Sequence, residues 1–230
     1  MKYYILLITT LFIFSCGKGK TVQLPEINHS EISEINDVSA AYLFYDETQK
    51  DSVELNRKNL ISTTNWLVNV DKRLTLKQAI PHIKFIQEKK NNSNHKNENS
   101  KNYFTCNDTS KKNLGFIEFT DVVFNEESSS KNTSKISQLN FDKKLNLEIH
   151  SSNVITLIPI TNNSELIQSN ILNLNENIFN AVKNIEEEVE IILELNKSLL
   201  FQEYISIKST LSELNIKNVT ISNNEFISNY

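Results

Sequence analysis

The chain has 230 residues, with 24 Lys and Arg against 28 Asp and Glu, and 39% of its positions are hydrophobic. This length allows one large hydrophobic core or two small ones. A net charge of −4 argues against a nucleic-acid binder, which needs a basic surface to neutralise phosphates. The only glycines are Gly17, Gly19 and Gly115, so no glycine-rich phosphate loop is present and no cofactor is expected.

The first 15 residues have the composition of a secretory signal peptide. After Lys2, residues 3–14 are apolar except for Thr9 and Thr10. A permanent membrane span needs about 20 residues, so this run is too short to be one and is typical of a cleaved signal. No later stretch reaches that length, so we expect the rest of the chain to lie outside the membrane.

Residues Ile13, Ser15 and Cys16 occupy the positions of a short processing motif, with an aliphatic residue three places before the cysteine and a small residue directly before it. This pattern resembles the lipobox of bacterial lipoproteins. The resemblance implies that Cys16 becomes the mature N-terminus and carries acyl chains such as palmitate, with residues 16–37 as a tether. We therefore expect a membrane-anchored envelope lipoprotein that faces the periplasm. The alternative is an ordinary secretory signal that happens to end near a cysteine.

Residues 38–124 are predicted to form a first α+β module. A helix is predicted from Leu76 to Ile86, because apolar residues recur every three or four positions, and Thr75 with Gln78 forms a capping box at its start. Residues 51–64 show weaker helical periodicity. Apolar runs of strand length occupy residues 40–45, 66–70, 102–107 and 115–124.

Residues 141–230 are predicted to form a second α+β module, after a polar linker at 125–140. Two strands separated by a short polar turn predict a hairpin at its start. The predicted elements are the hairpin strands 145–149 and 154–158, helices from residue 175 and over 201–214, and strands 189–195 and 219–221.

Two parts of the chain match each other without a gap at an offset of 125 residues. Residues 66–90 and 191–215 both have the pattern of a strand, a polar turn and an amphipathic helix, and Ile80 falls opposite Ile205. A repeat of this kind indicates a duplicated β-α-β-α-β unit. Chance similarity between two strand-helix pairs is the alternative.

In the second module Asn196-Lys197 ends a strand, and the helix that follows carries Phe201 and Tyr204-Ile205 and ends near Asn215. This pattern, over about residues 145–225, resembles the periplasmic domain of the ExbD/TolR family. The resemblance implies two-layer modules with helices on one face of a mixed sheet, dimerisation, and contacts with envelope partners. Members of the family also carry a transmembrane helix with an ionisable aspartate. We see no such helix in this sequence, so ion conduction is not implied.

No residues have the spacing of a catalytic or metal site. Asp71-Lys72, between a strand and a helix, is predicted to form a turn, Glu186–Glu188 a solvated segment, and Cys106 a buried unpaired thiol. Trp66 is expected in the core. The four histidines are scattered and lack ligand spacing: His29, His82, His95 and His150.

We therefore expect a lipid-anchored binding or scaffold protein of the bacterial envelope, accessory to a proton-driven transport system, and not an enzyme. The expected partner is a second copy or another envelope protein, and nucleic acid is not expected. Val219, Thr220 and Ile221 are the predicted contact, because a short terminal strand leaves backbone groups open to another strand. The alternatives are a structural lipoprotein that binds peptidoglycan, and an envelope hydrolase whose catalytic groups meet only in the fold.

Overall fold

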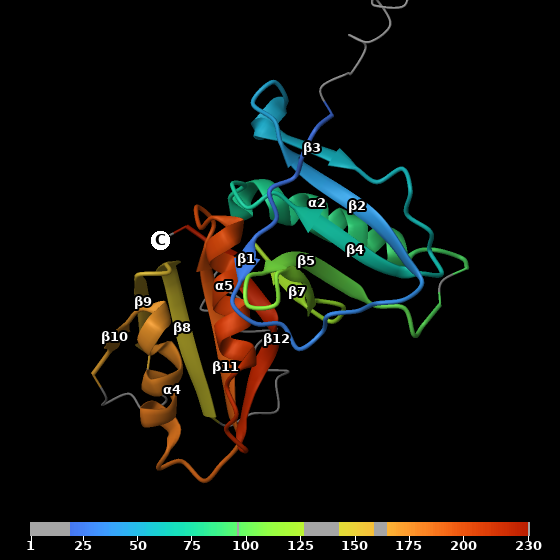
Figure 1. Ribbon diagram of the computed structural model, residues 1–230. Coiled ribbons are helices and arrows are strands. Elements are labelled where there is room, and N and C mark those ends of the chain that lie inside the picture. The colour runs from blue at the N-terminus through green and yellow to red at the C-terminus, as the bar shows by residue number, and fades with distance from the viewer. Residues whose placement is uncertain (1–18, 96, 127–142, 159–164, 230) are drawn as a thin grey trace, which may run out of the picture.

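The computed structural model describes residues 19–95, 97–126, 143–158 and 165–229. Two mixed β-sheets, one with a single α-helix on one face and the other with two, confirm the predicted α+β class (Figure 1). Their hydrophobic residues form one continuous core that extends through both modules.

The first sheet has the strand order β1-β5-β4-β2-β3, and β6 pairs with β5 as well. Strand β2 is parallel to β4 and antiparallel to β3, and β4 is parallel to β5. The elements are β1 (Glu26–Ile27), β2 (Val38–Tyr45), the short helix η2 (Lys50–Ser52), β3 (Val53–Asn56), β4 (Asn65–Val70), α2 (Leu76–Asn91), β5 (Asn102–Asp108) and β6 (Asn113–Glu118).

The second sheet has the order β10-β9-β8-β11-β12-β7. Strand β8 is antiparallel to β9 and parallel to β11, which is parallel to β12. The elements are β7 (Val123–Asn125), β8 (Lys143–Ser151), β9 (Val154–Ile158), β10 (Ile167–Ser169), the short helix η4 (Ile171–Asn173), α4 (Leu174–Val182), β11 (Val189–Asn196), α5 (Phe201–Ser212) and β12 (Val219–Ser228).

Helix α2 begins as its sequence predicts. The backbone N–H of Thr75 donates to Oε1 of Gln78 at 2.8 Å, which provides half of the predicted capping box. The predicted apolar stripe is fully buried, and it comprises Leu76, Ala79, Ile80, Ile83 and Ile86. Pro81 lies near the start of the helix, where the missing N–H removes a single hydrogen bond.

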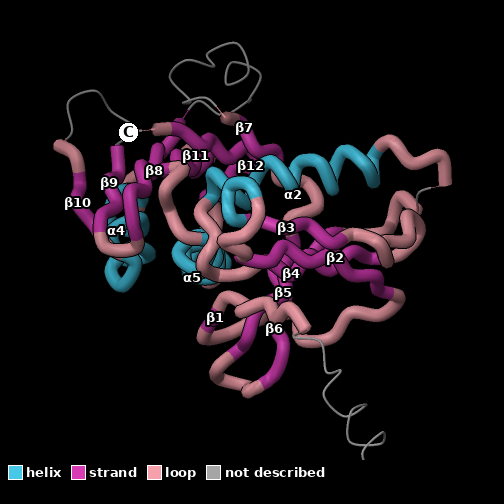
Figure 2. Tube along the Cα trace, turned by 90° about the horizontal axis from the view of Figure 1, so that it is seen from above, coloured by secondary structure: helices cyan, strands magenta, loops and turns pink. Residues whose placement is uncertain are grey.

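The strand order of the predicted repeat is present in both sheets, together with its second helix. The four strands β3-β2-β4-β5 of the first sheet have the same order and the same directions as β9-β8-β11-β12 of the second. In both, a parallel strand leads through a turn into a helix that packs on the sheet, α2 in one case and α5 in the other. In Figure 2, α2 lies above the first sheet and α4 and α5 lie below the second, as two modules related by rotation would.

The two modules are joined at equivalent residues. Thr75 and Leu200, which are 125 positions apart, form an antiparallel bridge. On one side of it Leu76 N–H donates to the Leu199 carbonyl at 2.9 Å, and on the other Phe201 N–H donates to the Leu74 carbonyl at 2.7 Å. Exchanging each residue for the one 125 positions away turns the first hydrogen bond into the second. The modules are therefore related by an approximate two-fold axis at this bridge, like the subunits of an isologous dimer.

Aromatic rings reinforce this junction from both sides. Phe104 of β5 stacks on Phe119 with ring centroids 3.8 Å apart, and meets the edge of Phe201 of α5 at 5.2 Å. Tyr204 lies at 6.1 Å from Phe104. Because these rings are fully buried, the first sheet and the helix of the second module share one core.

Three expected elements differ from the structure. Residues 51–64 form η2, β3 and turns, so the predicted helix is wrong. Val53 and Leu55 alternate with polar residues, which is the period of a strand. The predicted strand 115–124 ends at Glu118, and Val123–Asn125 joins the second sheet. The last strand has ten residues instead of three.

The predicted tether differs in part from the structure. Part of the stretch expected as a tether, residues 16–37, belongs to the fold, since Glu26–Ile27 pairs with β5 as strand β1. Residues 127–142, most of the predicted linker, lie outside the described residues. In the described part of the first module α2 is the only α-helix, so that module has one helix fewer than the predicted unit.

The junction should determine the stability of both modules together. We expect Leu74→Ala and Leu199→Ala each to lower the free energy of unfolding by about 2 to 4 kcal/mol, because both side chains are fully buried at the axis. Urea unfolding followed by circular dichroism should show a single transition for both variants. Leu172→Ala, at a side chain 90% exposed, should change little. Two separate transitions in the unmodified protein would contradict a shared core.

Candidate functional site

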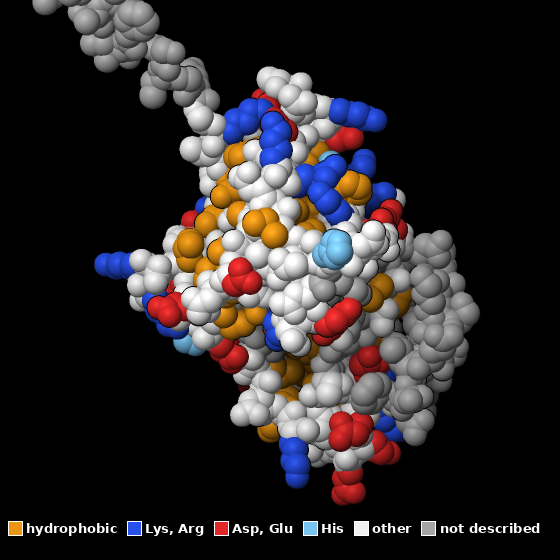
Figure 3. Space-filling view, turned by 90° about the vertical axis from the view of Figure 1, so that its right-hand side faces the viewer, with side chains coloured by type: hydrophobic (Ala, Val, Ile, Leu, Met, Phe, Trp, Pro, Cys, Tyr) orange, Lys and Arg blue, Asp and Glu red, His pale blue; other side chains and the backbone are white. Residues whose placement is uncertain are grey.

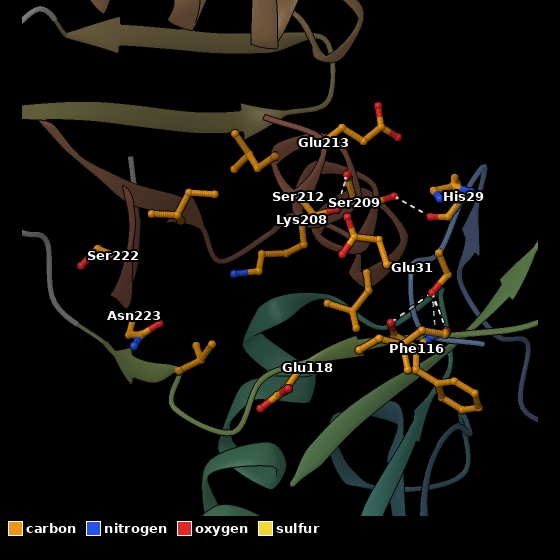
Figure 4. Close-up of a pocket in the computed structure, with 16 residues that line it drawn as sticks. His29, Glu31, Phe116, Glu118, Lys208, Ser209, Ser212, Glu213, Ser222 and Asn223 are labelled. Carbon is orange, nitrogen blue, oxygen red and sulfur yellow. Dashed lines mark hydrogen bonds between the residues drawn. The ribbon is translucent and has the colours of Figure 1, made fainter. Parts of the chain in front are cut away.

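A pocket of about 290 Å³ lies between the two modules (Figure 4). One wall comes from the first module, from residues 29–32 and 116–118. The other comes from α5 and from residues 221–223 of β12. The pocket therefore includes Ile221, one of the three residues predicted as a partner-binding edge.

Among the described residues, a strand lies on only one side of the first half of β12, Val219–Ile221, and we call this stretch the open half of β12. Val219, Thr220 and Ile221 pair with β11. On the other side β7 pairs with Asn224–Phe226, and no described strand runs beside Val219–Ile221. The carbonyl of Asn218 accepts from Val189 of β11 at 2.9 Å. Because backbone groups alternate in direction along a strand, those of Ile221 point away from β11, toward the pocket.

The first module shows what covers the same position there. Trp66 pairs with Asn102, and the equivalent residue Ile191 pairs with Ile221, so Asn102 and Ile221 occupy matching places in the two sheets. The chain that returns after β6 covers Asn102 with two hydrogen bonds. Asn102 N–H donates to Oγ1 of Thr120 at 3.0 Å, and its carbonyl accepts from Phe119 at 2.9 Å. In the second module the pocket takes the place of this covering segment.

A buried ion pair adjoins the pocket, because Lys208 lines the pocket and pairs with Glu225. Glu225 of β12 is fully buried, and its two oxygens accept from Lys208 Nζ at 2.6 Å and from the Tyr204 hydroxyl at 2.9 Å. Burial, together with the neighbouring Glu225 carboxylate, raises the pKa of Tyr204 well above its usual value. Lys208 extends from α5 into the pocket (Figure 4), but Glu225 already neutralises its charge.

The remaining walls are apolar inside and acidic at the rim. Ile32, Val122 and Leu211 contribute aliphatic surface, whereas Glu31 and Glu213 add carboxylates. No group of His, Cys, Asp or Glu in the described residues could hold a metal ion. An apolar pocket bordered by the open half of β12 and by carboxylates is suited to binding an extended segment.

A second pocket, of about 430 Å³, brings together residue types found in hydrolases. Asp51, Ser52 and His82 line it, and burial lowers the pKa of His82, opposed by Asp51. Asp51 and Ser52 have positive φ angles of 57° and 56° because they form the turn between β2 and β3. Gln78 Nε2 donates to the Asp51 carbonyl at 2.7 Å and fixes this turn. No hydrogen bond in the described residues joins Ser52 to His82.

The other residues singled out in the sequence have structural surroundings. Asp71 is buried in a turn, as predicted. Burial alone would raise its pKa, but hydrogen bonds from the Arg73 side chain and from backbone N–H groups lower it. Cys106 is a buried free thiol, as predicted, and burial raises its pKa to about 12. Trp66 lies in the core, and Glu186–Glu188 is exposed.

The structure does not bring the histidines together. His29 borders the pocket between the modules, whereas His82 borders the second pocket. His95 is exposed, and His150 is partly buried on β8. Cys16 lies outside the described residues.

Sequence reasoning missed most of the pocket. Its two walls are separated by more than 80 residues along the chain, and nothing in the sequence shows that they meet. Glu225 gave the one available signal, because a carboxylate inside a strand that continues into Phe226 and Ile227 indicates a buried acid with a partner.

No family model, curated protein or solved structure matches this chain. The ExbD/TolR resemblance of the second module therefore stays a prediction. None of the described helices is long and apolar enough to cross a membrane.

The stability of the protein should depend on the ion pair between Lys208 and Glu225. Lys208→Met leaves Glu225 buried without a counter-charge, so we expect the free energy of unfolding to fall by about 3 kcal/mol. The same substitution at the exposed Lys217 should change it by less than about 0.5 kcal/mol. Urea titration measures both variants. Equal losses at Lys208 and Lys217 would contradict a structural role for the buried pair.

Proposed function

We propose that this protein is a lipid-anchored component of the bacterial envelope that binds a partner in the pocket between its two modules. The observation that carries the proposal is the open half of β12 at Ile221, which borders a pocket of about 290 Å³. The sequence supports the anchor through its short apolar leader and Cys16.

The anchor would act through acyl chains at Cys16. Each buried CH₂ contributes about 0.8 kcal/mol to membrane attachment, so several chains on one residue give a stable anchor. A protein held in this way samples partners within the envelope at a high local concentration, which allows a modest pocket to be effective.

The binding mode that fits the pocket is addition of an extended segment to β12. Ile221 presents its backbone N–H and carbonyl toward the pocket, and Asn102, its counterpart in the first module, is hydrogen-bonded by Phe119 and Thr120. A partner segment would supply the equivalent donor and acceptor to Ile221. Backbone pairing of this kind gives affinity, and side-chain pockets give specificity.

The walls suggest the composition of that segment. Ile32, Val122 and Leu211 would contact an aliphatic side chain, and Glu31 and Glu213 at the rim favour a basic neighbour. Lys208 would not favour an acidic segment, because Glu225 already neutralises it.

The two-fold junction supports a partner other than a second copy. The edges that isolated modules would use to pair are joined within one chain at Thr75 and Leu200. We therefore propose that the protein is monomeric by itself and recruits a different envelope protein. A role beside a proton-driven transport system follows from the resemblance of the second module and is part of the proposal.

The anchor is tested by mass spectrometry of the protein extracted from bacterial membranes. We expect the N-terminal peptide to begin at Cys16 and to carry acyl chains, and the Cys16→Ser variant to carry no acyl chain at residue 16. An unmodified Cys16 in the wild-type protein would contradict the anchor.

Binding in the pocket is tested by introducing a bulky side chain at the border of the pocket. Asn223 is exposed and lines the pocket, so Asn223→Trp should close the opening without disturbing the core. Asn229→Trp makes the same change at an exposed residue away from it. After crosslinking in cells, we expect the envelope partner to be recovered with the wild type and Asn229→Trp but at least about tenfold less with Asn223→Trp.

Two further measurements complete this experiment. Urea unfolding should show equal stability for the two tryptophan variants. Binding to purified peptidoglycan sacculi, measured with the same variants, distinguishes a glycan occupant from a protein one. Equal recovery of the partner with both variants would contradict binding in this pocket.

A further inference from the structure

A third pocket, distinct from the two described above, is an apolar depression on the outer face of the first sheet, opposite the face that α2 covers. It has a volume of about 340 Å³. Ala41 and Leu43 of β2 face α2 and are fully buried, so the alternate residues Tyr42 and Phe44 face outward, and both are partly exposed. Their rings stack with centroids 5.9 Å apart. The lining residues are Lys20, Val22, Leu24, Tyr42, Phe44, Asn56 and Asn69.

The N-terminal segment enters the fold across this depression. Lys20 forms ion pairs with Asp46 and Glu54, at the ends of β2 and β3. Three residues later the carbonyl of Gln23 accepts from Lys72 at 2.8 Å, so the chain is fixed to the first module from Lys20 onward. Figure 3 shows hydrophobic side chains gathered on the side of the molecule from which the N-terminal chain leaves.

Little chain separates this face from the proposed anchor. Only three residues lie between Cys16 and Lys20. Even fully extended, that stretch spans at most about 14 Å. A protein acylated at Cys16 therefore holds Lys20, and the depression beside it, within about 14 Å of the acylated residue at the lipid surface.

We propose that the outer face of the first sheet lies against the lipid bilayer, with Tyr42 and Phe44 at the level of the headgroups. This inference rests on the proposed anchor. Aromatic rings are suited to that layer because it is apolar on one side and wet on the other. The second module then points away from the membrane, since it lies at the other end of the molecule from the N-terminal chain (Figure 1). The pocket between the modules stays accessible to a partner.

Charge contributes little to this contact. Lys20 is neutralised by Asp46 and Glu54, and its hydrogen bond lowers the pKa of Asp46 to about 2, so both groups stay ionised at neutral pH. Glu47 adds a further negative charge nearby. The contact should therefore occur on zwitterionic lipid and change little with salt, unlike the attachment of a polybasic surface.

Tryptophan fluorescence on vesicles with brominated lipids tests this orientation. The protein that begins at Cys16 is coupled through that thiol to a maleimide lipid in phosphatidylcholine vesicles. Cys106 does not compete, because it is buried. Phe44→Trp should lose roughly half of its added emission, as expected for a ring within ~10 Å of the acyl boundary. The native Trp66 is 1% exposed and gives the baseline.

Phe179→Trp is the matched control, because Phe179 is 51% exposed on α4 of the second module. Its emission should be unchanged by the brominated lipid. Equal quenching of the two variants, or no quenching of Phe44→Trp, would overturn the orientation. Because the coupling is chemical, the result does not depend on acylation in cells. Failure of the anchor is therefore seen in the mass spectrum and failure of the orientation in the fluorescence.

Discussion

The backbone pairing of Thr75 with Leu200 fixes the positions of the two modules. It is possible because the turn before each helix is built in the same way. An Asp71 oxygen accepts from the backbone N–H two residues later at 3.1 Å, and an Asn196 oxygen does the same at 2.9 Å. Each turn presents an extended edge of three residues, and the two edges satisfy each other. The junction thereby places Phe201 against Phe104 and closes the core between the modules.

The pocket forms at a position where the two modules depart from their two-fold symmetry. Asn102 and Ile221 are equivalent by register. The segment that contains Phe119 and Thr120 covers Asn102, whereas no described segment forms the equivalent hydrogen bonds to Ile221. That segment then continues into β7, which pairs with β12 beyond Asn223. One stretch of chain therefore protects the first sheet and borders the second. The two copies of the repeat have different connecting segments. Asn102 is therefore hydrogen-bonded by a neighbouring segment, whereas Ile221 lies in the open half of β12.

The sequence predicted the parts of this fold that depend on local periodicity. The stripe on α2, the hairpin of β8 and β9, and the matching strand-turn-helix pairs all have short-range patterns that packing preserved. It failed where strands are short or polar. Residues 51–64 contain too few apolar positions to separate a helix from a strand, and β1 has only two residues. Ile221 was predicted as an edge from its terminal place, but the wall opposite it depends on the two-fold junction. A backbone bridge between residues 125 positions apart, such as Thr75 and Leu200, leaves no local pattern in the sequence.

Fusion of the two modules in one chain explains why the proposed anchor and the proposed pocket occur once each. In a symmetric dimer every surface occurs twice, so two N-terminal segments would lie over two equivalent sheets and two equivalent edges would be open. Here the N-terminal segment from Lys20 to Leu24 lies on the first module, whereas Glu26 also bonds Gln202 of α5, and the open half of β12 belongs to the second module. Each of the two surfaces is on a different copy of the repeat. The junction at Thr75 and Leu200 keeps the two surfaces at a fixed separation, so the proposed anchor on the first module and the proposed binding edge on the second hold fixed positions relative to each other.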